Sequence, residues 1–195
     1  MPSPTRPALR HPFLMTLLAA LALAAGCSSY KQTGSSDPEA EKGRMLSADA
    51  YATELAFKKR DPTMSRFFES AYGYAVFPEV AKGGAGIGGA HGDGVVYEQG
   101  NKVGYAELSQ GSIGFQLGGQ VYSQIIFFKD KTTLDKFKQG EFEFAAQASA
   151  VAASAGAGAN ADYSDGVAVF TTGERGLMFE AAIGGQKFAY YPINR

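Results

Sequence analysis

Hydrophobic and polar residues follow a helical period up to about residue 73 and alternate with a period of two after it. Segment 47–60, SADAYATELAFKKR, predicts a first helix that Ser47 can cap. A second helix is predicted to begin at Asp61, ahead of a proline, and to end at Gly73, which suits a left-handed helix end. Ala48, Tyr51 and Leu55 share one face of the first helix.

The period of two after residue 73 is typical of strands with one buried face. One interruption, KDKTTLDKFKQG at 129–140, predicts a short helix. Residues 145–161 mix helix-forming alanines with helix-breaking glycines, and we interpret them as strand leading into a loop. The predicted fold is α+β: a predominantly antiparallel β-sheet, folded over or closed into a barrel-like core, with two N-terminal helices and one mid-chain helix. The candidate strands are 73–77, 93–98, 103–108, 112–117, 120–128, 141–147, 166–172, 177–183 and 186–191.

Residues 82–96, KGGAGIGGAHGDGVV, raise the question of nucleotide binding, because their glycines match the G-x-G-x-x-G spacing of dinucleotide sites. Such a loop needs a helix directly after it, whose N-terminus holds the phosphates, whereas Val95-Val-Tyr-Glu predicts a strand. A strand here would carry one face of almost bare backbone, which allows a helix, a crossing strand or a ligand to approach closely. Close packing is the favoured interpretation and a ligand groove the alternative. That face is Gly84, Gly86, Gly88, Ala90 and Gly92.

The first 26 residues are expected to be an export signal, with positive charge at Arg6 and Arg10 and an apolar run at 13–25 that is too short to remain as a membrane span. The run ends in small residues before Cys27 and resembles a bacterial lipobox. Cleavage before Cys27 and a covalent lipid anchor on its thiol are therefore expected. Cys27 is the chain's one cysteine, which fits lipidation better than a disulfide. The alternative is an ordinary signal that leaves a free thiol.

Ser28, rather than aspartate, follows the cysteine, which favours an outer-membrane protein facing the periplasm. Removing the signal leaves 16 basic and 19 acidic side chains, and this balance argues against bulk binding of nucleic acid. The polar residues that follow predict a flexible tether with a reach of about 20–25 Å. The expected organisation is a signal at 1–26, a lipidated tether at 27–46 and one domain at 47–195.

Four blocks of the domain resemble the SYLF domain family, a lipid-binding module: residues 73–98, 104–128, 134–150 and 166–192. The resemblance spans about residues 47–192 and implies binding of phospholipid headgroups through a basic N-terminal segment. No SH3, FYVE or actin-patch extension is recognised, so actin binding is not carried over, and the expected headgroup is an anionic phospholipid other than a phosphoinositide. The alternative for the basic cluster is a solvated helix end. The resemblance implies that Lys58, Lys59 and Arg60 are the lipid-binding residues, with Lys82 as a weaker candidate.

Catalysis is not expected, because His91 is the one histidine after the signal and no G-x-S-x-G elbow is present. His91 and Asp93 could supply two metal ligands, whereas a structural site needs about four. Glu141 and Glu143 share a strand face that amphipathic alternation explains. The sequence thus predicts a non-catalytic, lipid-anchored envelope protein that binds membrane phospholipid and uses no cofactor. Two alternatives stay open: docking of an envelope protein partner, or carriage of a small apolar ligand.

Overall fold

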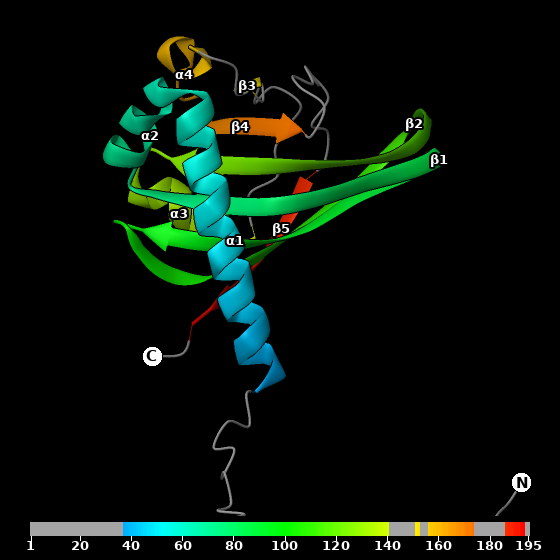
Figure 1. Ribbon diagram of the computed structural model, residues 1–195, viewed down its shortest axis with the longest axis horizontal. Coiled ribbons are helices and arrows are strands. Elements are labelled where there is room, and N and C mark those ends of the chain that lie inside the picture. Colours follow the sequence, from blue (N-terminus) through cyan, green and yellow to red (C-terminus); the bar gives the residue numbers. More distant parts are fainter. Residues whose placement is uncertain (1–36, 141–150, 153–155, 174–185, 194–195) are drawn as a thin grey trace, which may run out of the picture. The chain divides into compact units, whose positions relative to one another are not determined.

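The computed structural model describes residues 37–140, 151–152, 156–173 and 186–193; side chains within 84–87 and 112–118, and those of 151–152, are outside the description. Helices and one 3-10 turn precede and interrupt the strands (Figure 1). The helical elements are α1 (Pro38–Arg60), η1 (Pro62–Met64), α2 (Ser65–Ser70), α3 (Lys131–Lys138) and α4 (Ala157–Asn160). The strands are β1 (Gly73–Glu98), β2 (Asn101–Phe128), β3 (Val151–Ala152), β4 (Val167–Gly173) and β5 (Gln186–Pro192).

α1 begins nine residues before the predicted start at Ser47, so the expectation of a flexible tether is wrong for residues 38–46. Asp37 caps the helix by accepting a hydrogen bond from the backbone N–H of Glu39 at 3.1 Å, and Pro38 occupies the first turn. Proline and acidic residues favour a helix N-terminus. The polar composition of residues 38–46 therefore led to the wrong prediction, because the cap and the proline determine where this helix begins. Residues 1–36, with the predicted signal and Cys27, lie outside the described residues.

The second predicted helix is shorter than expected and ends at Ser70. Gly73 does not terminate a helix; it opens β1. A Cβ at Gly73 would lie 2.6 Å from the carbonyl oxygen of Tyr97, so close packing explains this glycine. The mid-chain helix is confirmed, with Leu134 buried on its inner side. The short helix α4 lies within 145–161, part of the segment interpreted as a loop.

The sheet is built on one long antiparallel hairpin, paired from Gly73↔Phe128 to Glu98↔Asn101. Five of the predicted strands are therefore parts of two continuous ones, because glycines that suggested turns stay extended within β1 and β2. The order is β1-β2-β4-β3, and β5 pairs with the N-terminal part of β2. The α+β class and antiparallel sheet are confirmed, although β3 runs parallel to β4. Among the described strands the pairings form no closed ring, so barrel-like closure is not confirmed.

Glycines let β1 fold back across itself. A Cβ at Gly92 would lie 2.6 Å from the carbonyl oxygen of Glu79, and one at Gly94 would lie 2.8 Å from that of Val76. Real Cβ atoms do not approach backbone this closely, so the crossing requires glycine at both positions. The prediction that the bare face admits a crossing strand is confirmed at Gly92. The surroundings of 84–87 are outside the description, and the predicted strands 141–147 and 177–183 also fall there.

Two hydrophobic cores lie on the two faces of this sheet. One is enclosed by the folded hairpin together with α3 and β5, where the rings of Phe137 and Phe188 lie 5.0 Å apart. The other lies beneath α1 and α2 and includes Ala50 and Phe57, both fully buried. α1 runs across the long strands on that side (Figure 1). The helices and the folded sheet thus fix the position of the C-terminal end of α1 against the strands.

Candidate functional site

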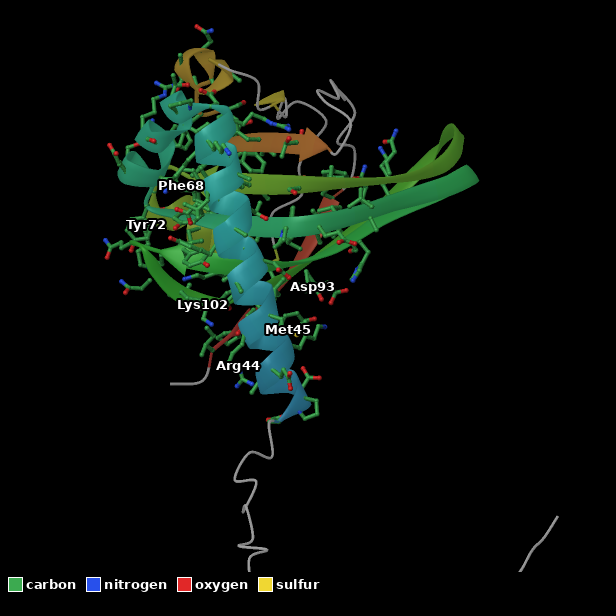
Figure 2. All side chains as sticks on the ribbon, viewed as in Figure 1. Arg44, Met45, Phe68, Tyr72, Asp93 and Lys102 are labelled. Atoms are coloured by element: carbon green, nitrogen blue, oxygen red, sulfur yellow. The ribbon has the colours of Figure 1, made fainter. Side chains whose placement is uncertain are left out.

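α1 turns a hydrophobic face away from the protein. The face shared by Ala48, Tyr51 and Leu55 is the exposed one: Tyr51 and Leu55 are 60% and 48% exposed, while Ala50 and Phe57 are buried. Both sides of the helix carry apolar residues, so the helical period did not identify the buried side. Met45 is 62% exposed and lies with Arg44 on the N-terminal half of α1 (Figure 2). We define the outer face of α1 as the exposed residues Met45, Ala48, Tyr51, Ala52, Leu55 and Ala56.

The four predicted lipid-binding cations occupy different environments. Lys58 pairs with Glu54 at 2.5 Å and lies 4.2 Å from the ring centroid of Phe68, so it is engaged within the domain. Lys82 is 8% exposed and has an interaction partner of its own. Lys59 and Arg60 are exposed at the end of α1, beside the outer face. Lys59 and Arg60 are therefore together at the surface, whereas Lys82 is buried.

A cavity of about 580 Å³ lies where the C-terminal end of α1 meets three strands; we call it the α1–β4 pocket. Arg60 donates a hydrogen bond from Nη1 to the hydroxyl oxygen of Thr172. Ser123 on β2 is paired with Thr172 on β4, and its hydroxyl donates to the carbonyl of Pro78 at 2.7 Å. The pocket is lined by Ala56, Lys59, Arg60, Pro78, Glu79, Val121, Tyr122, Ser123, Thr172 and Gly173.

A second cavity, of about 380 Å³, lies beneath the N-terminal half of α1 and has an acidic lining. Lys42 bridges it by pairing with Asp93 at 3.1 Å, and this contact raises the pKa of Lys42. His91 is exposed, with ring nitrogens 3.6 Å from Glu107 and 3.9 Å from Asp93. Across the part of the chain that the structure describes, no group of three or more His, Cys, Asp or Glu could hold a metal ion. The predicted pair His91 and Asp93 therefore gains no further ligands there.

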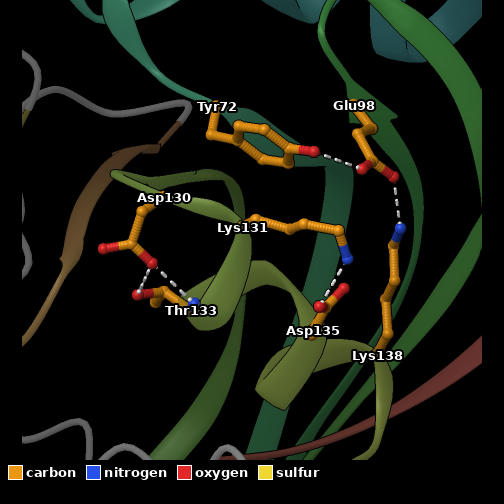
Figure 3. A network of polar contacts seen from close by, with 7 residues as sticks. All are labelled: Tyr72, Glu98, Asp130, Lys131, Thr133, Asp135 and Lys138. Atoms are coloured by element: carbon orange, nitrogen blue, oxygen red, sulfur yellow. Dashed lines mark hydrogen bonds and ion pairs between the residues drawn. The ribbon is translucent and has the colours of Figure 1, made fainter.

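A network of polar contacts joins α3 to the end of β1 (Figure 3). Glu98 accepts hydrogen bonds from the hydroxyl of Tyr72 at 2.9 Å and from Nζ of Lys138 at 2.6 Å. The bond from Lys138 is the main reason that the pKa of Glu98 lies below its usual value, and the bond to Glu98 raises the pKa of Tyr72. These groups satisfy one another, so the network fastens the helix to the sheet. Figure 3 also shows contacts within α3 and its cap: Lys131 donates to Asp135, and Thr133 donates to Asp130.

Three residues considered in the sequence analysis, Cys27, Glu141 and Glu143, lie outside the described residues. Within the described ranges, no helix combines the length and apolar character needed to cross a bilayer. Sequence reasoning missed Glu79, Ser123 and Thr172, which come together only through strand pairing. It also missed Met45, although the cap and proline at 37–38 would have indicated the longer helix.

Comparison with known proteins places this geometry in context. Residues 109–190 match the model of a family described as Ysc84, Las17-binding protein actin regulator. A curated relative is the "Beta cell expansion factor A" of Aeromonas veronii, which is 33% identical over 128 residues. That alignment covers 65% of this chain and 49% of the relative. The chain thus spans about half the length of the curated relative it matches.

Proposed function

We propose that this domain is a non-catalytic phospholipid-binding module that docks on a membrane through the outer face of α1; the match of residues 109–190 to the Ysc84, or SYLF, family model supports this. The observation that carries the proposal is the exposed face itself. Met45, Tyr51 and Leu55 are each about half exposed or more, next to exposed cations. Exposed apolar patches of this kind typically mark interaction sites. An apolar stripe flanked by Lys and Arg suits a helix lying in the membrane interface.

The expected affinity is modest. Transferring three half-exposed large side chains into the interface contributes about 1 kcal/mol each, roughly half of the value for full burial. Each of Arg44, Lys59 and Arg60 adds about 1 kcal/mol near an anionic surface. Together these terms approach about 6 kcal/mol, an affinity of order 0.1 mM. About half of this free energy is electrostatic, so binding should weaken markedly with salt.

The predicted anchor makes such weak binding sufficient. Cys27 precedes the helix cap Asp37 by ten residues. At no more than about 3.6 Å per residue, the start of α1 would lie within roughly 36 Å of the bilayer surface. A domain tethered this closely meets the membrane at an effective concentration of order millimolar. We propose the periplasmic side of the outer membrane as the location, on the lipobox at Cys27.

Vesicle co-sedimentation tests the proposal, using residues 27–195 with Cys27→Ala to remove the anchor. The chain should bind anionic vesicles at low salt, and the double variant Tyr51→Ser, Leu55→Ser should lose most of that binding. Tyr191→Ser is the matched apolar control, because Tyr191 is 52% exposed on β5, off the outer face. If the double variant bound vesicles as well as the unsubstituted chain, the proposal would be refuted. It would also be refuted if the chain did not bind vesicles and cross-linking in cells gave one dominant protein adduct, a result that would favour a protein partner.

A further inference from the structure

The α1–β4 pocket is built at one register of the sheet. Between Phe77↔Gln124 and Val80↔Tyr122 the pairing of β1 and β2 shifts, so Pro78 and Glu79 lie in a bulge opposite Ser123. Thr172 follows on β4, directly across from Ser123. Bulges redirect side chains and occur preferentially next to functional sites. Three strands thus present polar side chains at the place where α1 ends.

One part of the pocket lining can donate hydrogen bonds to an anion. Lys59 and Arg60 are exposed cations, and guanidinium has five N–H groups, of which the bond to Thr172 uses one. Because the Thr172 oxygen accepts from Arg60, the Thr172 hydroxyl proton can be donated elsewhere. Two cations and a hydroxyl donor suit a phosphoryl group, whose oxygens accept several hydrogen bonds.

Another part of the lining can accept hydrogen bonds. Glu79 contributes an exposed carboxylate. The Ser123 hydroxyl already donates to the carbonyl of Pro78, so its oxygen is left as an acceptor. A phosphodiester of an uncharged alcohol can donate a hydroxyl hydrogen bond to these acceptors, but it brings no positive charge to the Glu79 carboxylate. A primary ammonium carries three N–H donors and would pair with both, whereas a quaternary ammonium has none.

We infer that the α1–β4 pocket is a subsite selective for a phosphoryl group esterified to a short primary amine, the chemistry of a phosphoethanolamine headgroup. The cavity, at about 580 Å³, lies within the range of small-molecule sites. Ala56, Val121 and Tyr122 supply apolar surface beside the polar groups for the glycerol portion. This inference rests on the proposed membrane docking and names the headgroup that the docked domain would select, a zwitterionic one rather than the anionic one expected from the sequence.

Calorimetric titration with soluble headgroups tests selectivity separately from membrane docking. Glycerophosphoethanolamine should bind about fivefold more tightly than glycerophosphocholine, glycerophosphoglycerol or inorganic phosphate, the preference expected of one solvent-exposed ion pair. Glu79→Gln should abolish this preference and leave glycerophosphoglycerol binding unchanged. Arg60→Gln should weaken the binding of all three glycerophosphodiesters. The matched control is Glu69→Gln, which replaces an exposed acid on α2 and should change none of the affinities.

Equal affinity for the four probes, or a preference that survives Glu79→Gln, would overturn the inference. Phosphoethanolamine, the free monoester, distinguishes a soluble metabolite from a lipid headgroup: tighter binding of the monoester than of the diester would point away from lipid. Vesicle co-sedimentation reports separately on docking. Vesicle binding that persists in a chain lacking headgroup selectivity would refute the subsite alone, and selectivity without vesicle binding would refute the docking alone. Circular dichroism of each variant verifies that it is folded.

Discussion

Asp61 is the residue whose replacement should reveal most about how α1 is held. Its side chain is fully buried at the junction of α1 and η1. One carboxylate oxygen accepts hydrogen bonds from the backbone N–H of Thr63 at 3.0 Å and from its hydroxyl at 2.6 Å. The other accepts from the backbone N–H of Gly158 in α4 at 2.6 Å. Burial alone would raise the pKa of Asp61, but these hydrogen bonds outweigh it and lower the pKa.

The cost of Asp61→Ala can be worked from these contacts. Loss of the cap over Thr63 costs about 1 kcal/mol. The Gly158 N–H is buried and would lose its partner, which costs about 1–3 kcal/mol. We therefore expect a loss of about 2–4 kcal/mol in the free energy of unfolding. Asp61→Asn should keep the cap and lose only the bond from Gly158, so its cost should be about 1 kcal/mol smaller.

Urea denaturation of residues 27–195 with Cys27→Ala, followed by circular dichroism, measures these differences. Asp37→Ala is the matched control, because Asp37 caps the other end of the same helix through one exposed hydrogen bond. Its replacement should cost about 0.5–1 kcal/mol. If Asp61→Ala were no more destabilising than Asp37→Ala, the buried carboxylate would not be fastening α1 and α4 together, and the reasoning would fail.

Two further predictions concern the sheet. Gly92→Ala should destabilise the fold by about 1–3 kcal/mol, because its Cβ would meet the Glu79 carbonyl oxygen at 2.6 Å; Gly111→Ala, with nothing within 4 Å, is the control in thermal unfolding. Lys138 lowers the pKa of Glu98 below its ordinary 4.5, so this pair stabilises the fold above that pH and the stabilisation is lost as pH falls through the lower folded pKa. Glu98→Gln should therefore melt below the unsubstituted chain at about pH 7, and the gap should close as pH falls below the lowered pKa of Glu98. Equal melting of the two glycine variants, or a pH-independent gap for Glu98→Gln, would contradict these expectations.

Local signals predicted the elements that local chemistry determines. The cap at Asp61 and the amphipathic pattern of 129–140 identified real features, because each depends on neighbours within one turn. The start of α1 was also encoded locally, in Asp37 and Pro38, but the polar composition of the segment suggested a flexible tether instead. The continuity of β1 could not be predicted from local signals. Glycine permits both turns and extended backbone, and pairing with β2 selects the extended form.

The candidate site depends on tertiary structure to a greater degree. Lys58 and Lys59 are adjacent in sequence, but Glu54 and Phe68 engage the first and leave the second exposed. Only the fold determines which side of a helix is covered, so the exposure of Tyr51 could not be derived from its spacing. The pocket residues of β1, β2 and β4 meet through strand register, which a single sequence does not specify.

The turn at Gln99 and Gly100 has a consequence for how the chain folds. Both residues adopt positive φ, and the two long strands leave directly from this turn. The hairpin can therefore zip outward from the turn, each new pair forming beside the last, so that Gly73 reaches Phe128 without closing a large loop in one step. β5 pairs with the turn-proximal part of β2 and β4 with the far part, so we expect the edge for β5 to form early and the edge for β4 only when zipping is complete. The α1–β4 pocket would then be among the last features of the domain to assemble.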